Sequence, residues 1–224
     1  YSCMNSYMNL SINKYMVVAC STLACIASFT HAQAPLPVVT IAKDNTTIDQ
    51  SCRIRISPGV AIPDRDGNGV IQVTRGGITI EFEEGTVLQG NYAGKAAMAP
   101  EQLTGVGISI INPQGGRITV KNARIEGYKI GIHADNCDSL TIDGGIIRDN
   151  FRQRLRSTPI REDASDWLWP HANDNQEWRK NYGAAVCIEN STSVTISNLT
   201  VRHTQNGIIL DGVNQSQIFD NDCS

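Results

Sequence analysis

The feature that most constrains this chain is an internal repeat between Ile118 and Asn150. The apolar residues of ITVKNARIEGYKIGIHADNCDS return 22 residues later in LTIDGGIIRDN, where Leu140, Ile142 and Ile147 repeat Ile118, Val120 and Ile125. The same spacing relates Ile196 and Val201 to Ile218 and Cys223. A fixed period of about 20–25 residues, with three short apolar segments in each period, is typical of a solenoid.

Each predicted coil contains three short strands, which are ITV, ARIEG and KIGIHA in the first complete coil. Strands this short are stable only when they stack in parallel about 4.8 Å apart, so that each pairs with its equivalents above and below. The inward side chains then form continuous apolar ladders. Asn122 and Asn198 follow equivalent strands, and Asn tolerates the left-handed backbone that such turns need. The sequence therefore predicts an all-β parallel solenoid with about 22 residues per coil.

Residues 1–34 have the pattern of a secretory signal peptide. Lys14 precedes an apolar run, YMVVACSTLACIASF, and the AQA that ends at Ala34 supplies the small residues of a cleavage site. The run is too short for a stable membrane span. We therefore expect a secreted or periplasmic protein. A buried N-terminal helix and a lipoprotein anchor at Cys20 or Cys25 are the alternatives.

The charge balance and the cysteines argue against two classes of function. The net charge is −3, whereas a nucleic-acid-binding protein usually has a basic face, so nucleic acid is not an expected partner. The cysteines that follow the signal peptide are widely spaced and form no C-x-x-C pair, which argues against a zinc site. Cys137, Cys187 and Cys223 fall inside the repeats, where we expect small buried side chains.

Four segments carry a resemblance to a known superfamily: ITVKNARIEG, GIHADNCDSLTI, SVTISNLTVRHTQNGIIL and SQIFDNDCS. They resemble the carbohydrate-binding and sugar-hydrolase repeats of the right-handed parallel β-helix, or pectin-lyase-like, superfamily. The resemblance extends over roughly residues 53–224 and implies a right-handed parallel β-helix domain over residues 35–224. Such proteins are mostly extracellular and cleave, epimerise or bind polysaccharides, although a fold alone does not establish a function. Because the sequence ends in mid-coil without a visible C-terminal cap, we also expect further coils beyond Ser224.

An interruption of 32 residues, 151–182, separates two of the repeats. It contains all three tryptophans of the chain, Trp167, Trp169 and Trp178. An insertion in a repeat protein forms an outward loop, often on the binding face. Indole faces stack against sugar rings, and arginines such as Arg161 bind uronate groups. The alternative is that the tryptophans pack the loop onto the solenoid as a structural flap.

The insertion also carries the titratable residues best suited to catalysis, which are Asp166, His171, Asp174 and Glu177. Glycoside hydrolysis needs two carboxylates roughly 5–10 Å apart. Elimination or epimerisation needs instead a base and a group that neutralises the uronate. The insertion offers both sets, so its composition does not discriminate between these reactions. A surface or hydrogen-bonding role for His171 is a further alternative.

A second candidate set lies on the coil that follows the insertion. His203 and Asp211 flank the turn between VRH and GIIL, and the insertion begins at the same corner, so we expect His203 beneath the loop. Arg148 and Arg202 share a register once the insertion is removed. The pattern predicts that these arginines stack one above the other, either in a substrate groove or on a solvated polar face.

The segment DRDGNG, residues 64–69, matches the beginning of a calcium loop. The twelfth position, where a bidentate glutamate belongs, is Arg75, and a cation there repels the metal. We therefore interpret the segment as a tight turn, with calcium as the alternative and no other cofactor indicated.

Together these features favour an exported β-helix protein that binds, and cleaves or epimerises, an extracellular acidic polysaccharide. An enzyme of this kind would be a polysaccharide lyase, an epimerase or a glycoside hydrolase, and the arginine-rich insertion favours lysis or epimerisation. The alternative is a non-catalytic structural, adhesion or periplasmic module. One version resembles the periplasmic β-helix proteins that assist copper-site assembly in nitrous oxide reductase, but only Met98 and three histidines follow the signal peptide as ligands beside the cysteines.

Overall fold

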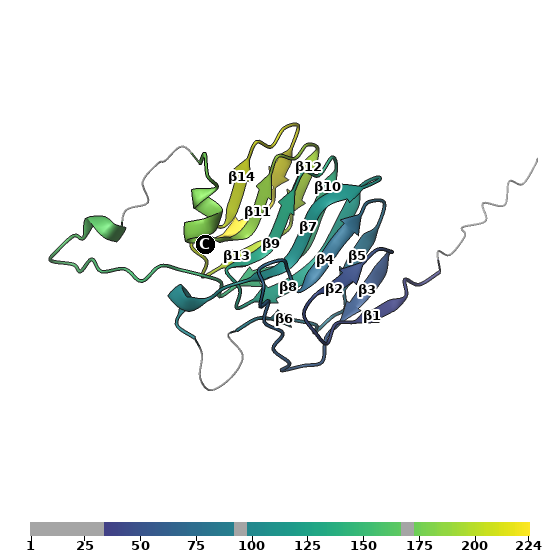
Figure 1. Ribbon diagram of the computed structural model, residues 1–224, viewed down its shortest axis with the longest axis horizontal. Helices are drawn as coiled ribbons and strands as arrows, with labels where there is room; N and C mark the ends of the chain where they lie inside the picture. The colour runs from purple at the N-terminus through teal and green to yellow at the C-terminus, as the bar shows by residue number, and fades with distance from the viewer. Residues whose placement is uncertain (1–33, 92–97, 167–172) are drawn as a thin grey trace, which may run out of the picture. The chain divides into compact units, whose positions relative to one another are not determined.

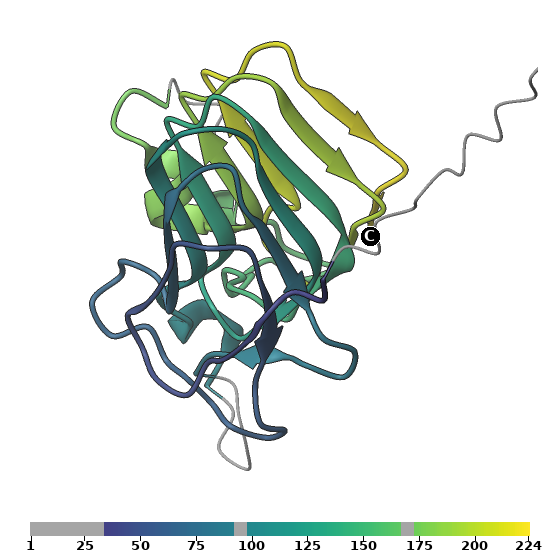
Figure 2. The same cartoon turned by 90° about the vertical axis from the view of Figure 1, so that its right-hand side faces the viewer.

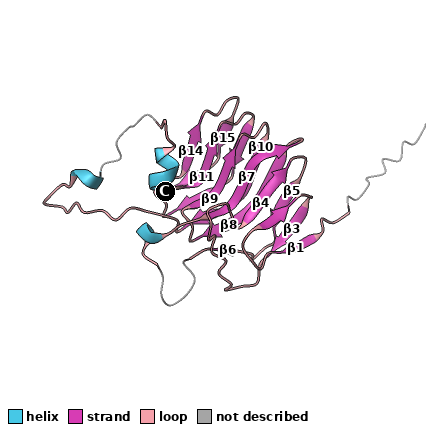
Figure 3. Cartoon of the chain, in the orientation of Figure 1, coloured by secondary structure: helices cyan, strands magenta, loops and turns pink. Residues whose placement is uncertain are grey.

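The computed structural model describes residues 34–91, 98–166 and 173–224, and in this part of the chain the regular structure is dominated by parallel strands. These strands stack in two sheets, as expected for a β-solenoid (Figures 1 and 3). The predicted signal peptide, residues 1–34, lies outside the described residues apart from Ala34.

Sheet A has ten strands, and its main path runs β1-β3-β5-β8-β10-β12-β15, with β6 beside β8, β13 beside β10 and β16 beside β13. Its strands are β1 (Val38–Thr40), β3 (Cys52–Arg55), β5 (Thr79–Phe82), β6 (Leu88–Gln89), β8 (Ile118–Glu126), β10 (Leu140–Arg148), β12 (Val194–Ser197), β13 (Thr200–Arg202), β15 (Gln217–Phe219) and β16 (Asp222–Cys223).

Sheet B has six strands in the order β14-β11-β9-β7-β4-β2. They are β2 (Thr46–Ile48), β4 (Ile71–Arg75), β7 (Val106–Gln114), β9 (Ile130–Asp135), β11 (Ala184–Glu189) and β14 (Ile208–Asp211). In the described connections lie three short helical elements, namely the 3₁₀ helices η1 (Pro100–Gln102) and η2 (Ala164–Asp166) and the π-helix η3 (Trp178–Tyr182).

The strand register follows the repeat in the sequence. Leu140, Ile142 and Ile147 of β10 pair with Ile118, Val120 and Ile125 of β8, and further on Ile196 pairs with Ile218 and Val201 with Cys223. A slip of one residue would turn these apolar side chains outward, so the burial of one face fixes the register. The spacing is not constant along the chain, because Val120 also pairs with Ile80, and Ile142 also pairs with Ile196 across the insertion.

The inward side chains of both sheets form one hydrophobic core. On sheet A, the ladder Ile80, Val120, Ile142 and Ile196 is completely buried. On sheet B, its counterpart consists of Ile71, Ile108, Ile132 and Val186. Figure 2 shows the sheets turned by 90°, with the strands of successive coils one behind another. Burying each such side chain stabilises the fold by about 1.5–3 kcal/mol, so the stacked coils form the predicted apolar ladders.

The turns confirm one detail of the sequence analysis and modify another. Asn122 and Asn198 have φ angles of 54° and 56°, as predicted for left-handed turn positions. In β8 and β10, however, the first two predicted strands of a coil form one continuous strand that bends, whereas in the following coil they separate into β12 and β13. Strand pairing therefore continues across the bend in β8 and β10 but is interrupted at the same bend in the following coil, although Asn198 is left-handed there as well.

All four cysteines in the described residues are free. Cys137 and Cys187 are buried as expected, and burial raises their thiol pKa values to about 11 and about 12. The expectation for Cys223 is wrong, because this side chain is exposed on β16, which pairs on one side with β13.

Candidate functional site

The outer face of sheet B carries three carboxylates in one column, Asp135, Glu189 and Asp211. Each is the last residue of its strand, and in the register Asp135 pairs with Glu189 and Glu189 with Asp211. They point outward because the preceding residues, such as Ala134 and Ile188, face the core. Neighbouring strands lie about 4.8 Å apart, so adjacent carboxylates are roughly 5 Å apart and the outer two roughly 10 Å. We call these three residues the carboxylate column.

The middle residue of the column is enclosed, whereas the outer two are partly accessible. The Glu189 side chain is 3% exposed, and its Oε2 lies 2.8 Å from His133 Nε2 and 2.9 Å from Arg179 Nε. Its Oε1 has no hydrogen-bond partner among the described residues. The Arg179 contact is an ion pair, because the Nε–H of Arg179 is not aligned for a hydrogen bond. Glu189 is therefore a buried carboxylate with one oxygen available to a further donor.

His133 is held in its neutral form by its surroundings. Burial lowers the pKa of His133 most, the bond to Glu189 opposes that shift, and the positive charge of Arg179 adds to it. A neutral imidazole can donate only from the nitrogen that carries the proton, and the carboxylate can only accept. The contact therefore requires the proton on Nε2, which donates to Glu189.

The outer two carboxylates are bonded by asparagines. The Nδ2 of Asn190 donates to Asp135 Oδ1 at 2.9 Å, and the Nδ2 of Asn173 donates to Asp211 Oδ2 at 2.6 Å. Both aspartates remain partly exposed, so solvent or a ligand reaches them.

The end of the insertion together with Gly183, residues 173–183, packs over the column. We call it the docked segment. Trp178 lies against an apolar cluster on the outer face of sheet B, which consists of Val106, Ile130, Ala184, Cys187 and Ile209. Asn173 Oδ1 accepts the backbone N–H of Trp178 at 3.0 Å, and Lys129 Nζ donates to the backbone oxygen of Lys180. Trp178 thus packs onto the solenoid wall, as the flap interpretation expects. Trp167, Trp169 and His171 lie outside the described residues.

The described loop residues chosen from the sequence bond mainly within the loop. Asp166 accepts the backbone N–H groups of Arg156 and Ser157. A hydrogen bond from the side chain of Ser157, together with these backbone bonds, lowers the pKa of its carboxyl. Glu177 accepts bonds from Asn175, which lower its pKa in the same way.

Two more of these loop residues lie at the surface. Asp174 is exposed, and Arg161 is exposed in a turn in which its N–H donates to Thr158. Asp211, by contrast, belongs to the carboxylate column.

The arginines predicted to stack do share a register, since Arg148 of β10 pairs with Arg202 of β13. Each is paired with a carboxylate: Arg148 Nε lies 3.0 Å from Glu126 Oε2, and Arg202 donates to Asp222. These pairs partly neutralise the arginine stack, as on a solvated polar face.

His203 lies at a left-handed turn position of the same corner, with a φ angle of 52°, and its Nδ1 lies 2.9 Å from Asp149 Oδ1. Its side chain is 63% exposed, so the described residues leave most of it open to solvent.

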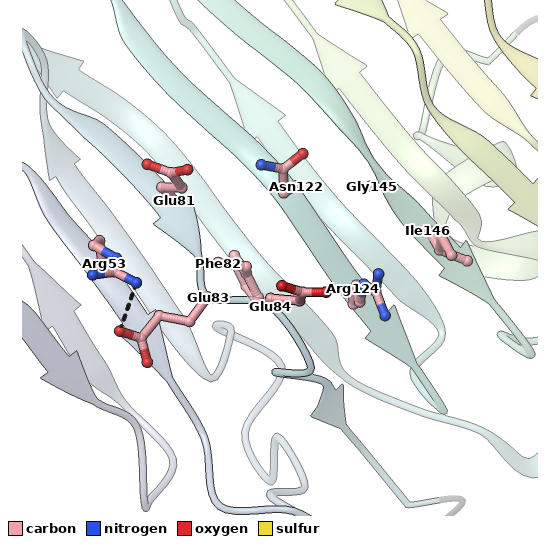
Figure 4. Close-up of a pocket in the computed structure, with 9 residues that line it drawn as sticks. All are labelled: Arg53, Glu81, Phe82, Glu83, Glu84, Asn122, Arg124, Gly145 and Ile146. Atoms are coloured by element: carbon pink, nitrogen blue, oxygen red, sulfur yellow. Dashed lines mark ion pairs between the residues drawn. The ribbon is translucent and has the colours of Figure 1, made fainter.

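The outer face of sheet A also has a pocket, of about 520 Å³ (Figure 4). It is lined by Arg53, Glu81, Phe82, Glu83, Glu84, Asn122, Arg124, Gly145 and Ile146. The charges here alternate, because Arg53, Glu81, Lys121 and Asp143 succeed one another in register. Glu83 bridges to Arg53 at 3.1 Å and to Arg55 at 2.6 Å. The charges on this face therefore largely compensate one another, in contrast to the column on sheet B.

Three other carboxylates could hold a metal ion, because Asp44, Asp64 and Asp66 each place an oxygen within 4.8 Å of the others. Asp64 already accepts the backbone N–H groups of Gly67, Gly69 and Val106, which supports the tight-turn interpretation. Oxygen ligands suit calcium, but calcium takes 6–8 of them.

Comparison of the chain with protein-family models, with curated proteins and with solved structures finds no match. Within the described residues, no helix has the length and apolar character needed to cross a membrane.

Asp135, Glu189, His133 and Arg179 were not predicted as site residues from the sequence. A signal was present, since the strands IGIHAD, AAVCIE and IILD all end on an acidic residue. Aligning the coils at that position would have revealed the column. The contact with Arg179 could not be found in this way, because it depends on how the insertion returns to sheet B.

Proposed function

We propose that this protein is an exported β-helix protein of the pectin-lyase-like kind, which binds an acidic polysaccharide on the outer face of sheet B and hydrolyses it there. The observation that carries the proposal is the carboxylate column, in which Asp135, Glu189 and Asp211 stack in register. Like charges directly opposite one another destabilise a sheet. On sheet A the comparable positions alternate in sign. A same-sign column is therefore better explained by a ligand than by stability.

The spacing within the column suits two-carboxylate chemistry. One carboxyl group protonates the glycosidic oxygen, and the other carboxylate activates a water molecule. Since Glu189 is 3% exposed, Asp135 and Asp211 are the pair that a polymer can reach. Their separation, roughly 10 Å between alternate strands, is close to the range of inverting hydrolases, about 6.5–9.5 Å. Hydrolysis with inversion of the anomeric centre thus replaces lysis as the favoured reaction.

The described part of the insertion supplies cations for an acidic polymer. Four arginines of the loop are exposed, namely Arg152, Arg154, Arg156 and Arg161. Guanidinium groups bind carboxylates in a bidentate manner, so these arginines are candidate partners for the uronate groups of an acidic polymer.

The test is incubation of the purified chain with pectin, alginate and sulfated glycans, with assays for new reducing ends, unsaturated uronate products and binding. We expect new reducing ends and, by NMR, an inverted anomeric product. Asp135→Asn and Asp211→Asn should each lower the rate about 100-fold or more. Asp143→Asn, on sheet A, is the matched control and should keep the wild-type rate.

Two other outcomes would replace the proposal. Unsaturated products would identify a lyase. No product and no binding, together with a loss of stability in the two aspartate variants, would favour a non-catalytic structural module, which the packing of Trp178 on the wall also fits.

A further inference from the structure

We propose that the docked segment, residues 173–183, is a lid over the carboxylate column that the Arg179–Glu189 ion pair holds closed and that mild acid releases. The proposal rests on the proposed function in taking the column as the ligand site. The contacts that hold the lid closed involve no ligand.

The closed position depends on a small number of contacts. The side chain of Arg179 is 25% exposed and reaches inward to Glu189, which is 3% exposed. Trp178 covers the apolar cluster beside it, and Asn173 bonds directly to Asp211. The same segment therefore encloses the middle carboxylate of the column and occupies a hydrogen-bonding site of an outer one.

Glu189 has spare capacity that the closed lid does not use. His133 and Arg179 both contact Oε2, whereas Oε1 is buried without a partner among the described residues. A buried carboxylate oxygen without a donor is unfavourable. Opening the lid gives that oxygen access to water or to a ligand hydroxyl, so part of the cost of breaking the ion pair is recovered.

His133 makes the closed state sensitive to acid. Its ring faces Glu189 and Cys187 on β11, Ser109 on β7, Asp135 on its own strand and Arg179 on the lid. The thiol of Cys187 stays neutral because burial raises its pKa to about 12. Protonation of His133 would place a second cation on the same carboxylate oxygen that Arg179 contacts. Two cations then compete for one oxygen in a buried setting, and the one on the movable segment is displaced.

The direction of the pH effect follows from proton binding. The pKa of His133 is lowered when the lid is closed, mainly by burial. Solvent-exposed histidine has a pKa of about 6.5, so below that pH the open state binds more protons than the closed one. The closed state is therefore fully stable above about pH 6.5 and loses stability as the pH falls from there towards the lowered pKa.

Fluorescence of Trp178 tests the lid without any substrate. In a chain that carries Trp167→Phe and Trp169→Phe, Trp178 is the only tryptophan. We expect its acrylamide quenching constant to rise at least twofold between pH 8 and pH 5, with a shift of emission to longer wavelength. Arg179→Gln should show the high quenching constant already at pH 8. His133→Gln, which keeps a donor for Glu189 but cannot be protonated, should abolish the pH dependence.

Arg161→Gln, an exposed arginine in the same insertion, is the matched control and should behave as the parent chain. Far-UV circular dichroism checks that each variant retains its β-sheet signal. The pH series on the parent chain tests the lid without any substitution at the ion pair. A quenching constant that does not change between pH 8 and pH 5, or that is unaltered by Arg179→Gln, would overturn the lid. Because no glycan is present, this failure is distinct from a failure to hydrolyse polysaccharide.

Discussion

At the scale of single residues, the Asp64 side chain stabilises the first turns of the solenoid. It is 4% exposed and accepts the backbone N–H groups of Gly67, Gly69 and Val106 at 2.9, 3.1 and 2.7 Å. Asp64→Ala leaves these donors without partners, so we expect the free energy of unfolding to fall by about 3 kcal/mol. Urea denaturation measures the change. Asp66→Ala, which alters an exposed carboxylate of the same turn, is the control, and an equal loss there would contradict this role for Asp64.

Residue-scale features could be predicted from the sequence where their cause is local. The left-handed turns at Asn122 and Asn198 follow from residue type and repeat position, and their φ angles agree. The environment of Glu189 could not be predicted, because AAVCIE is an ordinary apolar strand in sequence. Its partners His133 and Arg179 come from another coil and from the insertion, and only the folded chain brings them to one oxygen atom.

At the scale of elements, Gly183 joins η3 to β11 and fixes where the docked segment ends. Its φ and ψ angles of 60° and −176° lie in a region open almost only to glycine, and an added Cβ would lie 2.3 Å from the backbone oxygen of Lys129. We expect Gly183→Ala to destabilise the chain by about 3 kcal/mol in thermal unfolding. Gly77→Ala shares a positive φ of 74° but meets no atom within 4 Å, so it should cost about 1–2 kcal/mol. Equal losses of stability in the two variants would show that the clash between the added Cβ at Gly183 and Lys129 does not contribute.

The strands were largely predictable as elements, whereas the insertion was not. The repeat period and the alternation of apolar and polar residues predicted the β8–β10 pairing, because residues a fixed distance apart form the apolar face. The π-helix η3 has no such pattern, and its position is determined by Trp178 and Arg179 meeting the wall of sheet B. The position of η3 is therefore set by tertiary contacts and could not be predicted from the period of the apolar residues.

At the scale of the whole molecule, each strand contacts chiefly the strands above and below it, so stability should vary along the stack of coils. Ile142 is completely buried between Val120 and Ile196, whereas Ile218, on β15, is 41% exposed. Ile142→Ala removes side-chain contacts on both sides and leaves a cavity that rigid neighbouring coils fill only in part. We therefore expect a loss of about 3–4 kcal/mol in urea denaturation. Ile218→Ala should cost less than about 1 kcal/mol.

The same variation of stability along the stack of coils should appear in native-state hydrogen exchange. Backbone amides of β8 and β10, which have partners on both sides, should exchange only through global unfolding, whereas those of β15 and β16 should exchange through local opening. If Ile142→Ala speeds the exchange of the β8 and β10 amides but leaves that of β15 and β16 unchanged, the loss of stability is confined to neighbouring coils. Equal protection along the whole stack would instead mean a single cooperative unit, in which the position of a substitution no longer matters.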